Sequence, residues 1–267
     1  MPTLLRPGWM AAISLLIFMV GCAAQPTNPS FPITARQADR DLDRIAAAPR
    51  PLDRPLVVIG GFTDPGLAPT AVRMRFDELT ADKRIINVQL GTCFSFDECR
   101  TKVVNAVEHA FPSRDPSQTV AVDVIGLSMG GLAARYAAMP AGPAHRKRLR
   151  IARLFTISSP LNGARMAAEA PLVHPLIEPM RPGSKMLRDI NAAAPAYPIF
   201  SYVRLGDNPV GAFYAAPPGR VAWWLSTPPL SIAHTGAMWD PRILADIARR
   251  LRGEAPFATD PPAPLPT

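Results

Sequence analysis

Short, mostly apolar segments rich in β-branched residues recur along the chain and predict buried strands. They lie at Leu56–Ile59, Ile85–Val88, Thr119–Ile125, Leu154–Ile157 and Ile199–Leu205. Short apolar runs of this kind, bounded by polar or turn residues, are typical of strands buried on both faces of a parallel sheet. We therefore predict a mostly parallel β-sheet at the centre of the fold.

Helical periodicity fills the intervals between these strands. Apolar residues recur at the spacing of one helix face near residues 34–48, 95–111, 132–137 and 240–251. Ser95 and Glu98 form a capping box at the start of one helix, and Asp240 followed by Pro241 marks the start of the last. The alternation of strands and helices predicts an α/β fold with a doubly wound sheet.

The length of 267 residues fits one domain, which we place at residues 55–254. Residues 161–198, between the fourth and fifth strands, are irregular and rich in proline. An insertion there would lie over the carboxyl edge of the sheet as a small cap or lid, with Leu176 and Ile177 facing the substrate. A packed surface loop is the alternative. The Pro-rich residues 255–267 are predicted to be disordered.

Residues 1–22 have the pattern of an export signal. Arg6 supplies a positive charge, and an uncharged apolar stretch follows that is too short to span a bilayer comfortably. Its end, Met19-Val20-Gly21-Cys22, resembles the lipobox of bacterial lipoproteins. That resemblance implies a lipid on Cys22, and the alanine after it favours the outer membrane, facing the periplasm. An ordinary signal peptide or an apolar start of a cytoplasmic protein stays open. Residues 23–54 would then be a tether with a short helix.

The formal charge of +8 comes mostly from arginine and is compatible with a nucleic acid or an anionic membrane as a partner. The densest basic run, His145–Arg150, has no interleaved aromatic residues, and no nucleic-acid-binding motif is present. We therefore expect no nucleic-acid partner and interpret the run as a solvated loop or a membrane-facing patch. No metal-binding motif appears, so we infer no metal ion and no cofactor.

Two cysteines, Cys93 and Cys99, are left in the chain once an exported protein has used Cys22 for its lipid. An even pair in an oxidising compartment is typically bridged, so we predict a Cys93–Cys99 disulfide. The loop that it would close is short, and the chain-entropy model gives only about 2 kcal/mol of stabilisation. Two free, buried thiols are the alternative.

The strongest chemical signal is Gly126-Leu127-Ser128-Met129-Gly130, which follows an apolar strand and precedes a helical pattern. A sharp turn from strand to helix holds the central serine in a strained backbone conformation above the edge of the sheet. Gly126 and Gly130 suit this turn because larger residues there would keep the strand and the helix apart. The pattern predicts Ser128 as a nucleophile at a helix N-terminus.

Here the sequence resembles the α/β-hydrolase superfamily, in particular bacterial lipases and esterases. Their turn typically reads Gly-His-Ser-Met-Gly-Gly, and Leu127 stands where they carry His, which is not a catalytic position. Their first core strand ends in His-Gly-x, and this chain has Gly60-Gly61-Phe62. Their Thr-x-x-Thr-Pro-His-x-Gly is matched loosely by Thr156–Gly163. The resemblance implies that Ser128 attacks an acyl carbonyl while the backbone N–H groups of Met129 and Phe62 hold the oxyanion.

The same resemblance assigns a general base and an acid in the chain order serine, acid, histidine. Of the four histidines, His234 lies in a loop just before the last helix, where the fold requires the base. His109 precedes the serine, His145 lies in the basic run and His174 lies in the cap segment. Asp207 directly follows the fifth strand, as the family's acid does. The less suitable carboxylates are Asp123 before the serine, Asp189 in the cap segment and Asp240 at the helix start.

These residues predict a serine hydrolase of carboxylic esters, an esterase or lipase that acts on an ester or lipid substrate. An acyltransferase or thioesterase would use the same three residues, because water and an alcohol compete for one acyl-enzyme. A lipoprotein that keeps this fold without catalysis is a further alternative. The substrate and the oligomeric state cannot be read from the sequence.

Overall fold

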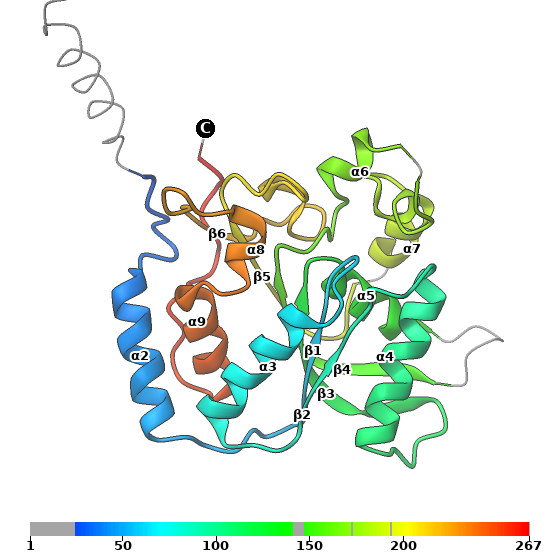
Figure 1. The fold of residues 1–267 in the computed structure, drawn as a ribbon, viewed down its shortest axis with the longest axis horizontal. Helices are drawn as coiled ribbons and strands as arrows, with labels where there is room; N and C mark the ends of the chain where they lie inside the picture. The colour runs from blue at the N-terminus through cyan, green and yellow to red at the C-terminus, as the bar shows by residue number, and fades with distance from the viewer. Residues whose placement is uncertain (1–24, 141–146, 172, 193, 267) are drawn as a thin grey trace, which may run out of the picture.

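The computed structural model describes residues 25–140, 147–171, 173–192 and 194–266 (Figure 1). Within them, six strands form one parallel sheet in the order β2-β1-β3-β4-β5-β6. The strands are β1 (Leu56–Ile59), β2 (Ile85–Val88), β3 (Gln118–Leu127), β4 (Arg148–Ile157), β5 (Ile199–Arg204) and β6 (Trp223–Leu225). The predicted parallel α/β sheet is confirmed.

Helices cover both faces of the sheet, as the doubly wound pattern predicts (Figure 1). One face carries α2 (Ala35–Ala47), α3 (Leu67–Thr80) and α9 (Pro241–Leu251). The other carries α4 (Phe96–Ala110) and α5 (Met129–Ala138). Shorter helices lie in the loops: α6 (Arg165–Glu169), η1 (Glu178–Met180), α7 (Lys185–Ala192), η2 (Ala212–Tyr214) and α8 (Ala233–Ala237).

The strands are buried on both sides because successive side chains point to opposite faces of a sheet. In β1, Val57 and Ile59 pack in the core under α4 and α5, whereas Leu56 and Val58 pack in the core under α2, α3 and α9. All four side chains are fully buried. This explains why the strand is apolar throughout instead of alternating.

Strand β4, helix α3 and strand β6 differ from the sequence-based expectation. Strand β4 begins at Arg148, so the second half of the basic run is strand and not loop, and its residues pair with β3 from Gln118 onward. His145 and Arg146 lie outside the described residues. Helix α3 and strand β6 were not predicted, because α3 mixes charged and apolar positions and β6 has only three residues.

The Pro-rich C-terminal tail is packed against the domain, so the prediction of disorder there is wrong. The indole N–H of Trp223 donates to the Thr259 carbonyl (2.9 Å), and that of Trp224 donates to the Pro264 carbonyl (2.9 Å). The Ala263 N–H donates to the Ser30 hydroxyl (2.8 Å), which joins the two ends of the described chain. Proline keeps its carbonyl acceptor, and the buried Trp224 uses that of Pro264.

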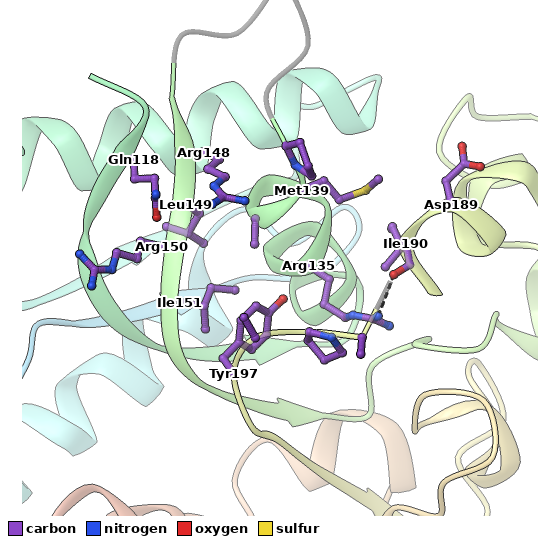
Figure 2. A pocket seen from close by; sticks show the side chains of 15 residues that line it. Gln118, Arg135, Met139, Arg148, Leu149, Arg150, Ile151, Asp189, Ile190 and Tyr197 are labelled. Atoms are coloured by element: carbon purple, nitrogen blue, oxygen red, sulfur yellow. Dashed lines mark hydrogen bonds between the residues drawn. The ribbon is translucent and has the colours of Figure 1, made fainter. Parts of the chain in front are cut away.

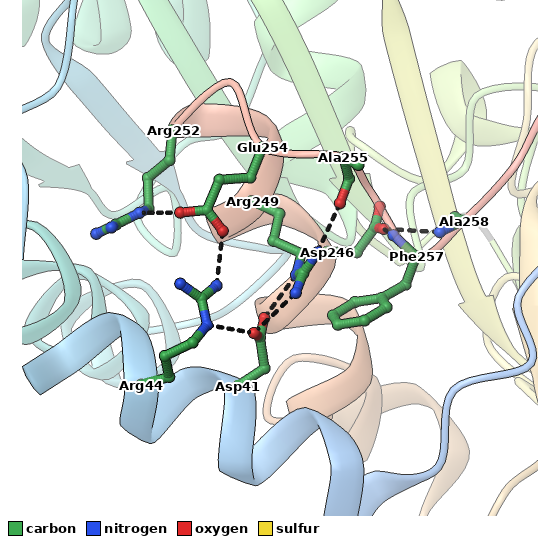
Figure 3. A network of polar contacts seen from close by, with 9 residues as sticks. All are labelled: Asp41, Arg44, Asp246, Arg249, Arg252, Glu254, Ala255, Phe257 and Ala258. Carbon is green, nitrogen blue, oxygen red and sulfur yellow. Dashed lines mark hydrogen bonds and ion pairs between the residues drawn. The ribbon is translucent and has the colours of Figure 1, made fainter. Parts of the chain in front are cut away.

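The N-terminal helix α2 belongs to the same domain and is not a free tether. It begins with a capping box between Thr34 and Gln37 and packs on α9. Asp41 receives two hydrogen bonds from Arg249, at 2.7 and 2.9 Å, and Arg44 pairs with Glu254 at 2.6 Å (Figure 3). Figure 3 also shows the carboxylate of Asp246 accepting the N–H of Phe257 and Ala258, where the tail leaves α9.

Residues 1–22, with the predicted lipid site Cys22, lie outside the described residues. Among the helices of the described part of the chain, none is long and apolar enough to cross a membrane.

The predicted disulfide is not formed: Cys93 and Cys99 are free, buried thiols. Cys93 precedes α4, Cys99 lies in its first turns, and both side chains pack in the core under that helix. Burial, reinforced by contact with Cys93, raises the pKa of the Cys99 thiol well above its ordinary value. The neutral thiol is therefore the stable form, and a neutral thiol is a poor nucleophile for disulfide exchange.

The described residues of the segment 161–198 pack onto the domain through their apolar side chains. Leu176, Ile177 and Met180 are buried in the same core as α4 and α5, so the expectation that Leu176 and Ile177 face a substrate is wrong. Arg135 of α5 fastens α7 by donating to the Asn191 side chain (2.6 Å) and the Ile190 carbonyl (3.1 Å).

Candidate active site

Ser128 lies at the carboxyl end of β3, where the sheet changes its winding direction. The neighbouring strand β1 leads into α3 on one face, and β3 leads into α5 on the other. At such a point the two connections separate and leave a crevice at the carboxyl edge, which is where α/β sheets bind ligands. Gly61 follows β1 directly beside Ser128, since a Cβ at Gly61 would lie 3.1 Å from that of the serine.

The turn around Ser128 has the strained geometry that the sequence predicts. Ser128 has φ 51° and ψ −126°, a region that costs a non-glycine residue free energy. A Cβ at Gly126 would lie 2.3 Å from Gly131 Cα, and one at Gly130 would lie 2.3 Å from the Ile59 carbonyl oxygen. Both contacts are far shorter than side-chain atoms tolerate, so each position requires glycine.

The structure brings Ser128, His234 and Asp207 together in one hydrogen-bonded chain. His234 Nε2 lies 3.0 Å from the Ser128 hydroxyl oxygen. His234 Nδ1 lies 3.0 Å from both carboxylate oxygens of Asp207. A carboxylate on Nδ1 leaves Nε2 as the acceptor for the serine proton, which is the arrangement of an acyl-transfer triad.

Asp207 is held rigidly in the loop after β5. Its carboxylate is fully buried, and one oxygen also accepts the Val210 N–H at 3.0 Å. Gly206 before it has φ 78°, a left-handed backbone conformation that glycine adopts without steric cost. The acid therefore presents its oxygens to His234 in a fixed orientation.

The other carboxylates are engaged elsewhere. Asp123 lies earlier in β3 and binds Arg153 through two hydrogen bonds of 2.9 and 2.6 Å. Asp189 on α7 is paired with Lys185 at 2.6 Å. Asp240 caps α9, as predicted, by accepting the Arg242 N–H at 3.0 Å.

Two of the remaining histidines can be placed. His109 is exposed near the end of α4 and lies outside the site. His174, in the segment between β4 and β5, packs edge-on against Phe62 (4.9 Å between ring centroids) and stacks on Phe94 (5.4 Å). It thus joins that segment to the loops that follow β1 and β2, beside the nucleophile.

The two predicted oxyanion donors, Met129 and Phe62, each neighbour a residue at the site, Ser128 in one case and Gly61 in the other. Met129 is the first residue of α5, so its N–H belongs to the helix N-terminus, where N–H groups have no partner within the helix. Phe62 follows Gly61, whose backbone lies against the serine side chain. Backbone N–H groups placed in this way can stabilise a negative oxygen that develops on a carbonyl bound at Ser128.

No group of three or more His, Cys, Asp or Glu side chains in the described part of the chain is arranged to hold a metal ion. A pocket of about 400 Å³ lies at the opposite end of α5, lined by Arg135, Met139, Arg148 and Tyr197 among others (Figure 2). Because α5 rises about 1.5 Å per residue, the residues from Arg135 to Met139 that line this pocket lie about 10–16 Å along the helix from Ser128, so the pocket does not belong to the site.

The sequence predicted a loop around His234, but this residue lies in the short helix α8. Sequence reasoning also missed the residues that support this helix: Arg204 binds both Ser231 and Asp240, and only the capping role of Asp240 was visible in the sequence. The contacts join residues far apart along the chain, so no local pattern indicates them.

No protein-family model and no curated protein matches the sequence. The structure does resemble solved structures. The lipase BlEst2 from Bacillus licheniformis in its propeptide form aligns with a TM-score of 0.50 and 12% identity, over 82% of this chain and 53% of that one. Its mature form aligns with a TM-score of 0.49 and 14% identity, over 71% of this chain and 88% of that one. Phospholipase PlaB from Legionella pneumophila aligns with a TM-score of 0.51 and 12% identity, over 74% of this chain and 59% of that one.

This chain thus spans little more than half of the propeptide form and of the phospholipase. At such identities the likeness concerns the course of the backbone and not the chemistry of the site. Together with the parallel sheet and its helices on both faces, it shows that the chain has the α/β-hydrolase fold.

Proposed function

We propose that this chain is a serine hydrolase that cleaves carboxylic esters. The observation that carries the proposal is the hydrogen-bonded chain from Ser128 through His234 to Asp207, placed on a strained turn at the carboxyl edge of the sheet. The names of the structural neighbours, a lipase and a phospholipase, support an ester or lipid substrate.

In the proposed reaction, the Ser128 oxygen attacks the ester carbonyl carbon while His234 Nε2 takes its proton. The N–H groups of Met129 and Phe62 stabilise the oxyanion of the tetrahedral intermediate. The carbon–oxygen bond to the alcohol then breaks, and His234 returns the proton to the leaving oxygen. Water repeats the two steps on the acyl-enzyme, which releases the acid and restores the serine. Asp207 orients His234 and stabilises its charged form.

A fluorophosphonate probe and a series of p-nitrophenyl esters test this proposal on the protein lacking residues 1–22. We expect labelling of Ser128 and ester hydrolysis, both lost in Ser128→Ala. Adding an alcohol acceptor separates hydrolysis from acyl transfer, since a transferase would make a new ester in place of free acid. A folded protein that neither reacts with the probe nor hydrolyses any ester of the series would refute the proposal.

We also propose that the protein is lipidated at Cys22 and held at the outer membrane, facing the periplasm. The support is the charged start, the apolar run and the lipobox-like Met19-Val20-Gly21-Cys22. Each buried methylene of an acyl chain contributes about 0.8 kcal/mol to anchoring, so several chains on one cysteine hold it stably. A Cys22→Ala protein that is processed and membrane-bound like the wild type would contradict this.

A further inference from the structure

An arginine at the end of β5 connects the strand that leads to the acid with the loop before α8, the short helix that contains the base. Arg204 is the last residue of β5 and precedes Asp207 by three positions. Its Nε donates to a carboxylate oxygen of Asp240 at 2.6 Å, and its Nη1 donates to the Ser231 hydroxyl at 2.9 Å. Ser231 lies just before α8, the short helix that contains His234.

The ion pair with Asp240 fixes the position of the Arg204 side chain. The Asp240 side chain is fully buried, and the Arg204 side chain is 8% exposed. Burial by itself would raise the pKa of the Asp240 carboxyl, but hydrogen bonds and charge from Arg242 and Arg204 hold it below its ordinary value. The carboxylate is therefore charged at neutral pH and binds two guanidinium groups at once.

The second guanidinium reaches the other end of the same loop. Arg242 donates to Asp240 from Nε (2.9 Å) and Nη2 (2.7 Å), and its Nη2 also donates to the Ser226 carbonyl at 3.0 Å. Ser226 directly follows β6, and Ser231 ends the loop before α8. One buried carboxylate thus fixes both ends of the loop 226–231 through two arginines.

Arg204 also touches α8 itself. A Cβ at Gly236 would lie 2.4 Å from Arg204 Nη1 and 3.0 Å from the Ser231 hydroxyl. Helix α8 therefore packs against the Arg204 guanidinium at Gly236, five positions after Ser231. A side chain at Gly236 would push the helix and the guanidinium apart. His234 lies between these two contact points, with its ring 3.0 Å from both Ser128 and Asp207.

We propose that Arg204 is a positioning residue that holds His234 at hydrogen-bonding distance from Ser128 by clamping α8 through Ser231 and Gly236. The inference rests on the proposed function and adds the support of its general base. A planar guanidinium with several N–H donors can serve Asp240 and Ser231 together, which the single ammonium of lysine cannot do in the same geometry. Arg204 itself does not touch the reacting atoms.

The test compares Arg204→Ala with Arg153→Ala, kinetically and thermally. Arg153 is a matched control, because its side chain also extends from a strand to a buried aspartate. It binds that residue, Asp123, through two hydrogen bonds, away from the site. We expect both variants to lose thermal stability. We expect only Arg204→Ala to lose kcat, by about 10²-fold with little change in KM, because a misplacement of about 1 Å can cost that factor. Arg204→Lys should recover only part of the loss.

Chemical rescue provides a readout that a general loss of stability would not move. Added guanidinium ion at a concentration below its denaturing range should restore kcat of Arg204→Ala several-fold, and urea at the same concentration should not. If Arg204→Ala does not fold, Ser231→Ala takes its place, since it removes only the hydroxyl that Arg204 binds. We then expect a loss of kcat of about tenfold, because Ser231→Ala removes one hydrogen bond from a charged guanidinium, and such a bond contributes about 1.5 kcal/mol or more.

The outcomes separate this inference from the proposed function. A wild-type protein without fluorophosphonate labelling or ester hydrolysis overturns the proposed function. An active wild type overturns the positioning role of Arg204 if a folded Arg204→Ala keeps its kcat or loses no more than Arg153→Ala. The same holds if Ser231→Ala, used in its place, leaves kcat unchanged.

Discussion

Replacing Gly130 by alanine adds one methyl group at a tight contact between α5 and the end of β1. The new Cβ would lie 2.3 Å from the Ile59 carbonyl oxygen and 2.6 Å from that of Gly60, whereas real Cβ contacts essentially never fall below 3.0 Å. Both neighbours are backbone atoms of a buried strand end, so no side chain can rotate away. The helix start and the strand end must therefore separate by roughly 1 Å.

The structure sets the size of the two expected effects. Overpacking of a well-packed core costs about 1–3 kcal/mol, and backbone neighbours place this change near the upper value. About 3 kcal/mol corresponds to a fall in Tm of about 6–12 °C for a domain of this size. Gly60 precedes Phe62 by two positions, so the same separation should move a predicted oxyanion donor, and losing one such donor costs about 10²–10³ in kcat.

Gly253→Ala is the matched control for this prediction. Gly253 has φ 68°, and no atom lies within 4 Å of a Cβ placed there. Alanine at this position should therefore lower the free energy of unfolding only by the cost of a left-handed backbone, about 1–2 kcal/mol. Urea unfolding and the rate of ester hydrolysis per folded protein are measured for both variants. If Gly130→Ala were as stable as Gly253→Ala and as active as the wild type, the tight packing of the turn would be refuted.

Three further predictions follow from single side chains. Ser128→Ala should lose on the order of 10⁶ in kcat, since triad members act as a unit, with an unchanged circular dichroism spectrum; residual activity above a mock preparation would contradict the assignment. Asp41→Asn should destabilise the protein at pH 7. Burial would raise the pKa of Asp41, but Arg249 and Arg44 hold it below its ordinary value of 3.8, so its contribution is present above about pH 4 and is lost as the pH falls through the lower folded value. The difference in urea midpoint between the two proteins should therefore shrink below pH 4, and a constant difference would argue against the ion pair. Cys93 and Cys99 should both react with a thiol reagent in urea without prior reduction, and only slowly in the native protein; unreactive cysteines in urea would instead indicate a disulfide.

Local patterns in the sequence were sufficient for the elements whose causes are local. The apolar run at Leu56–Ile59 predicted β1 because a strand buried on both faces must be apolar at every position. Asp240 followed by Pro241 predicted the start of α9, since a cap and the first turn involve only neighbouring residues. The turn at Ser128 could also be predicted, because a side chain at Gly126 or Gly130 would clash with the backbone of the turn or of the neighbouring strand.

The Pro-rich tail was misread because its order depends on partners that are distant in sequence. Its composition offers no helix or strand, yet Trp223 and Trp224 bind its carbonyls and Ser30 binds its N–H. The two cysteines were misread for a similar reason. Their number and spacing allow a bridge, but both thiols are free in a core formed by α4 and the sheet.

The arrangement of the site itself was decided by the tertiary structure. Ser128 and His234 are 106 positions apart, and His234 and Asp207 are 27 apart, so their separations of 3.0 Å arise only when β3 and β5 end at the same edge of one sheet. Family resemblance could name the three residues, but it could not indicate that Arg204 binds Asp240 beside the helix of His234. Those contacts form because folding buries a carboxylate, and a buried charge must find partners wherever the packed chain places them.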